Sequence, residues 1–570
     1  MFGDADILTW RTANLGTLAL LLITILWRRY ATRRDSYAGH DKNGTSKGLV
    51  PSTFPYAFPL LGSLPVSYLW QPRAFVLDRN NFFQATHPVR VKILTQEFYA
   101  VRSPENIKAL FKASSACSSI PFVKFALGNA FGLPKKALRL FDKDDSGGGH
   151  VPYPGSTVEA RNRIDYLSHQ SMVQFLEGKG LAPFWERFEN SINQQLYGVY
   201  ECLDSSRWED REDLMKMVGD ETSVAILNAL CGPHLLRLNP GFVQDFWEFD
   251  QNLQTYLQGA ELRGIPWFLA PRAYAARKRV LNAVRNWQQY AREHFDDSAI
   301  DMNGDDPFWG SSLFRERQKM FLEMDGFDHA AIASPDFGAI WAVRNSLAST
   351  SWAVFDIYRD PELLASVRAE VDSCAVKGHN GRIRFDIEHL FRLPILQAVY
   401  AETLRLRMHF YIIRMPDRVD IRVQDWIIPR QKVIVTPTTV AHMDPEAWNT
   451  KDGEHPLDQF WVGRFLNYPL KGDNGSTPEF STKSLEGVWI PYGGGPRQCP
   501  GRHFAKRQIL LTIALIVSLF DCEVLEEGVR EDFSLWGFGS GISNPVGKVP
   551  MRIRRRGDKM PTKHERVGSN

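Results

Sequence analysis

The chain has 570 residues, of which 44% are hydrophobic, 12% aromatic and 23% charged, a composition that excludes a largely disordered protein. Its formal net charge of +3 is too small to indicate nucleic acid as a partner. The six cysteines are scattered without a CxxC pair, which argues against a disulfide framework or a zinc cluster and favours a reduced environment.

Residues 1–34 predict a single N-terminal membrane anchor. Ile7–Trp27 is mostly apolar and reaches the ~20 residues of a spanning helix if Arg11 snorkels to the lipid headgroups. Four arginines follow between residues 28 and 34, so the positive-inside rule places the rest of the chain on the cytosolic side. A cleaved signal peptide would carry its charge before the apolar run, and this one does not. A buried core helix is the alternative interpretation.

The remaining chain divides into three parts by composition. Residues 35–65 are polar and then proline-rich, and proline fixes φ and removes amide donors, so this stretch predicts a stiff, extended connector. No second linker of this kind follows, so residues 66–553 are interpreted as one large domain. Residues 554–570 form a basic, polar tail, which predicts a frayed end.

Helical periodicity dominates after residue 100. It predicts helices over Arg161–Leu176, Leu181–Leu203, Phe242–Leu262, Ala275–Phe295, Pro335–Tyr358, Pro361–Cys374 and His503–Ser518. Short apolar runs predict strands over Val89–Ile93, Phe98–Val101, Val419–Val423 and Lys432–Thr436. The glycine-rich stretch Asp144–Gly155 predicts a mobile loop. The expected fold class is therefore mainly α with small β-sheets.

The stretch Tyr492–Ala505, YGGGPRQCPGRHFA, carries the clearest chemical signal. A loop that enters a helix N-terminus brings backbone N–H groups and positive charge to a thiolate, here that of Cys499. Gly493–Gly495 allow a large planar ligand to approach the backbone, and Arg497 can pair with a carboxylate of that ligand. The alternative is a buried structural cysteine in a glycine-rich turn, and the surrounding pattern favours the ligand.

This stretch resembles the haem-binding loop of the cytochrome P450 superfamily, F-x-x-G-x-R-x-C-x-G-x-x-x-A. Tyr492 stands where Phe is usual, and the matching residues are Gly495, Arg497, Cys499, Gly501 and Ala505. The resemblance implies the cytochrome P450 fold, haem b (iron protoporphyrin IX) as cofactor, and Cys499 as the axial ligand of the iron. A thiolate ligand donates electron density that favours O–O cleavage.

Two further motifs of the superfamily follow in the expected order. Glu402-Thr-Leu-Arg405 matches E-x-x-R, and residues i and i+3 share a helix face, although exposed Glu/Arg pairs at this spacing are common and weak. Arg464 stands in a segment similar to F-x-P-E-R-F, without its Pro and Glu. The resemblance implies that these three residues form a buried structural network. It also places a haem-propionate arginine near Arg414.

The expected distal helix departs from the superfamily pattern. The oxygen-activating motif A-G-x-[D/E]-T aligns with Trp341–Asn345, so Arg344 replaces the acid and Asn345 the threonine. Asn345 is the candidate catalytic residue, because its amide can bind water, although it cannot relay a proton as a hydroxyl does. A helix residue that only faces its neighbours is the alternative. The pattern is similar to the sterol 7α-hydroxylase and prostacyclin synthase branch. The usual W-x-x-x-R of the superfamily is also missing from Arg161–Phe175.

The resemblance implies a monooxygenase of the endoplasmic reticulum membrane, with its catalytic domain facing the cytosol. Electrons would come from NADPH–cytochrome P450 reductase. A basic face of Arg497, Arg502, Lys506 and Arg507 suits an acidic reductase surface, and the alternative is that this face is only solvated surface. A lipophilic terpenoid, steroid-like or other secondary metabolite would bind an apolar pocket formed by Ala342–Leu347 and the Gly537–Pro545 hairpin. One alternative is an isomerase or dehydratase that acts on a peroxide without external electrons, and another is a non-catalytic membrane haem protein.

Overall fold

The structure is a computed structural model that describes residues 48–56, 62–63, 66–94, 96–257, 265, 267–378, 382–468, 478–526 and 528–557. The predicted membrane anchor over residues 1–34 lies outside these ranges. None of the helices in these ranges combines the length and the hydropathy that a membrane crossing requires.

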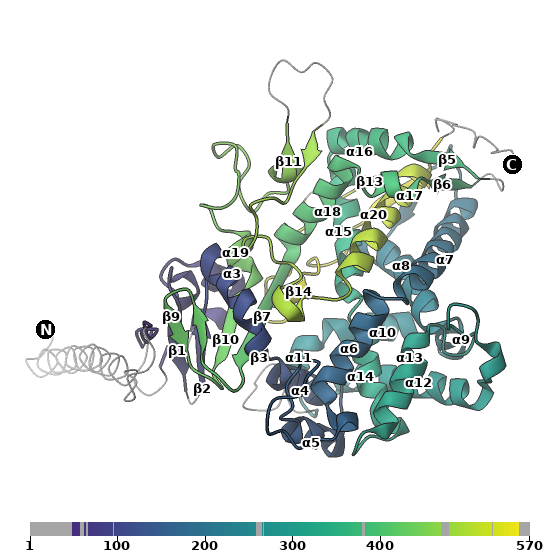
Figure 1. The fold of residues 1–570 in the computed structure, drawn as a ribbon. Coiled ribbons are helices and arrows are strands. Elements are labelled where there is room, and N and C mark those ends of the chain that lie inside the picture. Colours follow the sequence, from purple (N-terminus) through teal and green to yellow (C-terminus); the bar gives the residue numbers. More distant parts are fainter. Residues whose placement is uncertain are drawn as a thin grey trace, which may run out of the picture. The chain divides into compact units, whose positions relative to one another are not determined.

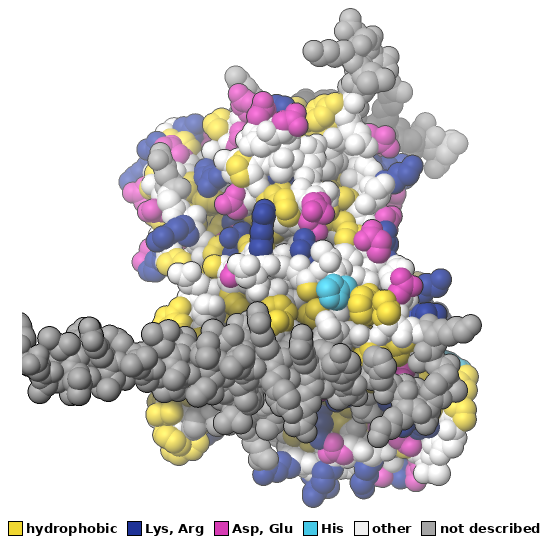
Figure 2. All heavy atoms as spheres, turned by 90° about the vertical axis from the view of Figure 1, so that its left-hand side faces the viewer, with side chains coloured by type: hydrophobic (Ala, Val, Ile, Leu, Met, Phe, Trp, Pro, Cys, Tyr) yellow, Lys and Arg dark blue, Asp and Glu magenta, His cyan; other side chains and the backbone are white. Residues whose placement is uncertain are grey.

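The chain forms two compact units, which are described separately. The first contains the described residues up to Ser118, together with Tyr411–Ala441 and Glu486–Ile490, and the second contains Ser119–Phe410, His442–Leu485 and the chain from Pro491 onward. Basic and acidic side chains are interspersed on the face shown in Figure 2.

The first unit is built on a small sheet (Figure 1). Strand β1 (Val89–Ile93) pairs antiparallel with β2 (Gln96–Ala100), β2 pairs parallel with β10 (Val433–Pro437), and β10 pairs antiparallel with Tyr411–Arg414 of β7. Helix α3 (Pro104–Ala113) and the hairpin β8–β9 (Ile421–Val423 and Trp426–Ile428) complete its core, which contains the buried side chains of Val101, Leu110, Val423 and Ile434.

The predicted connector is extended where the structure describes it, and it is joined to this sheet. Leu49 bridges Trp426, Thr53 bridges Arg90 and Gly62 bridges Ile93. The predicted boundary at residue 65 therefore separates segments that fold together in the first unit.

The second unit is mainly helical (Figure 1). Its principal helices are α4 (Ile120–Asn129), α5 (Lys135–Lys143), α6 (Ile164–Leu176), α7 (Leu181–Cys202), α8 (Leu214–Cys231), α10 (Phe242–Gln251), α12 (Pro271–His294), α13 (Ser312–Glu323), α14 (His329–Trp341), α15 (Arg344–Arg359), α16 (Pro361–Ser373), α18 (Pro394–Arg407) and α20 (Arg502–Leu519). Small sheets lie beside them: β13 (Phe520–Val524) pairs with β15 (Met551–Arg555), β15 with β4 (Glu209–Arg211), β5 (Ala375–Lys377) with β6 (Ile383–Phe385), and β14 (Ser540–Ile542) with Met408–Phe410 of β7 (Met408–Pro416).

Three of these helices form the centre of the second unit. Helix α20 is buried at every position from Gln508 to Leu519, α15 from Ser346 to Tyr358, and α18 from Ala398 to Arg407. A helix that is apolar or paired on all sides belongs in a protein interior. The buried body of α20 therefore holds its first residue, Arg502, and the loop that precedes the helix.

Most predicted elements form with small shifts of their ends, but three predictions are wrong. The predicted helix over Phe242–Leu262 ends at Gln251, and a short helix, α11 (Leu253–Leu257), follows. The predicted helix over Pro335–Tyr358 is two helices, α14 and α15. The predicted basic tail begins inside β15, which runs to Arg555 because Phe520 and Asp521 pair with Arg555 and Arg554.

Candidate active site

The loop around Cys499 is held against the start of α20. Gly493 and Gly495 have φ angles of 68° and 70°, a left-handed conformation that glycine adopts at little cost. The Cys499 N–H donates to the Tyr492 carbonyl at 3.1 Å, and Gly501 caps α20. The Cys499 side chain is exposed to solvent, so the loop presents an accessible sulfur at a helix N-terminus.

Backbone donors surround that sulfur. The surrounding protein atoms partly desolvate the Cys499 thiol, although it reaches solvent, and this raises its pKa above the ordinary value, whereas the N–H of Gly501, the charge of Arg502 and the N–H of Arg502 lower it. These groups stabilise negative charge on sulfur. A bound metal ion deprotonates its thiol ligand outright, so the surroundings of Cys499 suit a metal-bound thiolate.

Tyr492 is fixed at the opposite end of the loop. The Tyr400 hydroxyl donates to the Tyr492 hydroxyl at 2.9 Å, and the Tyr492 carbonyl accepts from Cys499. Burial raises the pKa of the Tyr492 hydroxyl, so it remains protonated. The tyrosine that replaces the usual phenylalanine thus ties the loop to α18.

Arg497 has a protein partner that the sequence did not indicate. It forms an ion pair with Asp165 of α6, and their side chains are 11% and 4% exposed. A Cβ at Gly148 would lie 1.8 Å from Arg497 Nη2 and 2.8 Å from Asp165 Oδ2, so a larger residue there would displace this ion pair. The carboxylate predicted to pair with Arg497 would therefore meet a guanidinium that Asp165 already neutralises.

The glycine-rich stretch Asp144–Gly155 is irregular, and its first part is bonded to the start of α6. Asp144 and Ser146 are buried. Arg163, at the start of α6, donates to Ser146 Oγ at 3.1 Å and to the His150 carbonyl at 2.8 Å. These bonds hold the loop beneath α6, beside the Arg497 ion pair.

The structure brings Glu402, Arg405 and Arg464 together. Arg405 Nε and Nη2 donate to the Glu402 carboxylate at 2.6 and 2.8 Å, and Arg464 Nε donates to it at 3.2 Å. All three side chains are fully buried. The Trp461 N–H adds a further bond to Glu402 at 3.0 Å, so the network ties α18 to the segment that precedes the cysteine loop.

The distal helix is interrupted at Ala342 and Val343. Ala342 N–H still donates to the Gly338 carbonyl, but Val343 N–H donates to Ile340 and Ser346 N–H to Val343, a tighter turn than an α-helix. Around this break Ala342 is exposed and its neighbours Trp341 and Val343 are partly accessible, as are Gly338 and Asn345. The break therefore faces a space that protein atoms do not fill.

Asn345 is hydrogen-bonded to Ile542, the last residue of β14. Its Oδ1 accepts from the Ile542 N–H at 3.0 Å and from Arg344 Nη1 at 3.2 Å. A Cβ at Gly541 would lie 2.2 Å from the same oxygen. The amide oxygen of Asn345 is therefore occupied by the hairpin, and its NH₂ group remains as a possible donor.

Arg414 is assigned to the other compact unit. It belongs to β7 within the first unit, opposite Ile434 of β10, whereas Cys499 belongs to the second unit. The predicted contact between Arg414 and a haem propionate stays a prediction.

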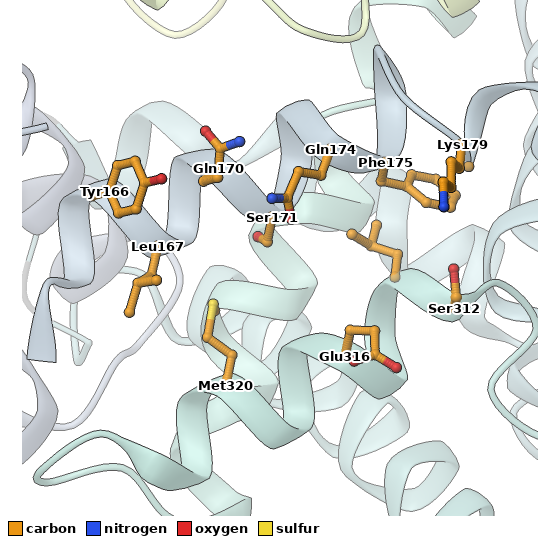
Figure 3. A pocket seen from close by; sticks show the side chains of 12 residues that line it. Tyr166, Leu167, Gln170, Ser171, Gln174, Phe175, Lys179, Ser312, Glu316 and Met320 are labelled. Atoms are coloured by element: carbon orange, nitrogen blue, oxygen red, sulfur yellow. The ribbon is translucent and has the colours of Figure 1, made fainter. Parts of the chain in front are cut away.

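A separate cavity of about 400 Å³ lies between α6 and α13 (Figure 3). It is lined by Tyr166, Leu167, Gln170, Ser171, Gln174, Phe175, Lys179, Gly180, Ser312, Leu313, Glu316 and Met320. Helix α6 turns another face, with Asp165, towards the cysteine loop. This cavity is therefore distinct from the site around Cys499.

The residues of the second unit fit a haem. They supply an accessible sulfur with backbone donors at a helix N-terminus and an open, largely apolar break in the distal helix. The sequence did not reveal Asp165 or Asp250, which hold Arg497 and Arg344, because both pairs join residues far apart in the chain.

Comparisons with known proteins agree with this site. The profile of the family described as Cytochrome P450 matches residues 339–549. The cytochrome P450 monooxygenase efuG of Hormonema carpetanum is 30% identical, with 95% of each chain covered, and the cytochrome P450 monooxygenase fsoE of Humicola fuscoatra is 32% identical, over 89% of this chain and 88% of that one. The 25-hydroxycholesterol 7-alpha-hydroxylase of Rattus norvegicus is 29% identical over 38% of this chain and 52% of its own. The chain belongs to the cytochrome P450 family, and it is an oxidoreductase with a haem cofactor.

Proposed function

We infer that the protein is a haem-thiolate monooxygenase that oxidises a lipophilic small molecule of the terpenoid or steroid-like class, with Cys499 as the axial ligand of the haem iron. The observation that carries this proposal is the accessible Cys499 thiol, with two backbone N–H donors, at the start of the buried helix α20. Haem bound there supplies the activation of dioxygen.

The chain's own residues contribute positioning. Gly501 and Arg502 stabilise the thiolate, and Tyr492 and Tyr400 hold its loop. The break at Ala342–Val343 presents accessible apolar side chains, which favour a lipophilic substrate. The likeness to a sterol hydroxylase supports the steroid-like class.

Electrons come from NADPH–cytochrome P450 reductase in this proposal. The predicted basic face is partly neutralised, because Arg502 pairs with Glu177 and Lys506 donates to Gln397 at 2.6 Å. Burial lowers the pKa of Lys506. The Cζ atom of Arg507 lies over the Phe391 ring, 5.7 Å from its centre. Electrostatic attraction between this face and an acidic reductase is therefore expected to be modest.

The proposed location is the endoplasmic reticulum membrane, with the catalytic domain in the cytosol. The apolar run Ile7–Trp27 and the arginines that follow it support this location. Fractionation of cells that produce the full chain, with and without residues 1–34, tests it. Loss of membrane association in the shortened chain alone is expected.

A second candidate reaction is the rearrangement of a peroxide without external electrons. Asn345 stands where a hydroxyl is usual, and its oxygen is bonded to Ile542. Turnover assays with and without reductase separate the two reactions. Product formation that requires reductase and consumes oxygen supports the monooxygenase, whereas product from a hydroperoxide alone supports the rearrangement. A non-catalytic carrier is disfavoured, since the family is enzymatic.

A further inference from the structure

A buried ion pair lies beside the break in the distal helix. Asp250 is on α10, Arg344 begins α15, and their side chains are 2% and 3% exposed. Arg344 Nε donates to Asp250 Oδ2 at 2.8 Å, and Trp341 Nε1 donates to Asp250 Oδ1 at 3.0 Å. Because Trp341 ends α14, one carboxylate binds both sides of the break.

The same guanidinium also holds the end of β14 and the two residues that follow it, Ile542–Asn544, which belong to the predicted Gly537–Pro545 hairpin. Arg344 Nη1 donates to the Ile542 carbonyl and to Asn345 Oδ1, and Arg344 Nη2 donates to Asn544 Oδ1 at 3.2 Å. Each guanidinium nitrogen therefore has an acceptor. The neighbouring Asn345 adds a second hydrogen bond to Ile542, because its Oδ1 accepts from the Ile542 N–H.

A third contact extends this attachment along the hairpin. Trp352 Nε1, two turns further along α15, donates to the Ser543 carbonyl at 2.7 Å. Three successive residues, Ile542, Ser543 and Asn544, are thus bonded to α15. These hydrogen bonds fix the hairpin relative to α15, and the bond to Asp250 holds the start of α15.

The charges of this pair are the reverse of what the family motif predicts. The position of the acid in A-G-x-[D/E]-T carries Arg344, and α10 supplies the carboxylate instead. Replacing a buried ion pair by apolar groups often costs nothing, whereas removing one partner leaves an unpaired buried charge. The pair therefore fixes a geometry more than it adds stability.

We propose that Asp250 and Arg344 are positioning residues that hold the helix break and the Ile542–Asn544 hairpin as one wall of the substrate pocket, and so decide which bulky ligands fit. This inference rests on the proposed function, because it takes the break at Ala342–Val343 and the hairpin to border the space beside the haem.

The test compares Asp250→Asn and Arg344→Gln with a matched control in the haem-loaded, full-length protein. Asp336→Asn is the control, because the Arg317–Asp336 pair joins α13 to α14 and is equally buried, with side chains 4% and 0% exposed. Hydrogen exchange is measured for the peptide that contains Ile542. Faster exchange is expected in Asp250→Asn and Arg344→Gln, and unchanged exchange in Asp336→Asn.

Ligand binding gives the second measurement. Binding of imidazole, a small iron ligand, and of ketoconazole, a bulky one, is followed by the haem spectrum. Asp250→Asn is expected to weaken ketoconazole binding about tenfold, equivalent to about 1.4 kcal/mol, with imidazole binding unchanged. The double variant Asp250→Asn/Arg344→Gln is expected to be no worse than the more affected single variant.

The outcomes distinguish a failure of this inference from a failure of the proposed function. If Asp336→Asn changes Ile542 exchange and ketoconazole binding as much as Asp250→Asn does, the pair has only a structural role and the inference is overturned. If the wild-type protein binds no haem, the proposed function fails instead, and the exchange result alone still reports on the hairpin.

Discussion

At the residue scale, the buried charges of the second unit are paired with specific partners. Glu402 accepts from Arg405, Arg464 and the Trp461 N–H, and Arg497 is matched by Asp165. The roles of these pairs differ. The Glu402 network joins two segments of the fold, whereas the Asp165 pair reduces the charge that Arg497 offers to a ligand.

The Glu402 network is expected to be essential for stability. Glu402→Gln removes the charge that compensates two fully buried guanidinium groups, so the free energy of unfolding is expected to fall by about 3–5 kcal/mol. Urea unfolding followed by circular dichroism measures this. The exposed pair Glu388–Arg392 supplies the control, since Glu388→Gln is expected to change stability little. Equal effects of the two variants would contradict the account.

His442 is expected to make the fold sensitive to acid. Burial, with help from the charge of Arg405, lowers the pKa of His442 to about 3, against about 6.5 in an unfolded chain. Between these values the unfolded state binds more protons, so stability falls as the pH falls from about 6.5, by up to about 1.4 kcal/mol per pH unit.

Urea titrations test this expectation between about pH 7 and about pH 4, where this linkage acts. His442→Gln is expected to flatten the decline in unfolding free energy with falling pH. A variant with the same slope as the wild-type protein would show that His442 does not contribute.

At the scale of elements, helix ends follow local rules more closely than helix interiors do. Helix α16 begins where Asp360 caps it, with Asp360 Oδ1 accepting from the N–H groups of Glu362 and Leu363 at 3.0 Å each, and Pro361 occupies its first turn. Its start was predicted at the right residue. The break between α14 and α15 has no such local signal, and the carboxylate that binds both sides of it, Asp250, lies on another helix.

The cap of α16 gives a direct test of this rule. Asp360→Ala is expected to lower the free energy of unfolding by about 1 kcal/mol, and Asp360→Asn by only a few tenths, because asparagine can also accept the capping bonds. Urea unfolding of the two variants measures the difference. Equal losses would mean that the capping bonds contribute nothing.

At the scale of the whole molecule, the haem is expected to contribute to folding stability. A ligand that binds only the folded state stabilises it in proportion to its affinity. The accessible positions around Ala342 and the exposed Cys499 are surfaces that haem would cover. Protein produced without haem is therefore expected to melt at a lower temperature, and reconstitution to restore it. Identical melting temperatures would argue against binding at this site.

Much of the fold and part of the site could be predicted from the sequence because they depend on local patterns. The cysteine loop and the Glu402–Arg405 pair lie within a few residues of chain. The Asp250–Arg344 and Asp165–Arg497 pairs span 94 and 332 residues, and no pattern in one segment reveals a partner so distant. For the same reason the split of the distal helix and the bonds from Arg163 to Ser146 and His150 were missed.

The central claim is that the sulfur of Cys499 binds the haem iron, and the spectrum of the reduced, carbon monoxide-bound protein tests it most directly. Cys202 is the other exposed cysteine in the described ranges, so Cys202→Ala is the matched control. The wild-type protein and Cys202→Ala are expected to show the strongly red-shifted Soret band of thiolate ligation, and Cys499→Ala to lack it. Persistence of that band in Cys499→Ala would contradict the assignment.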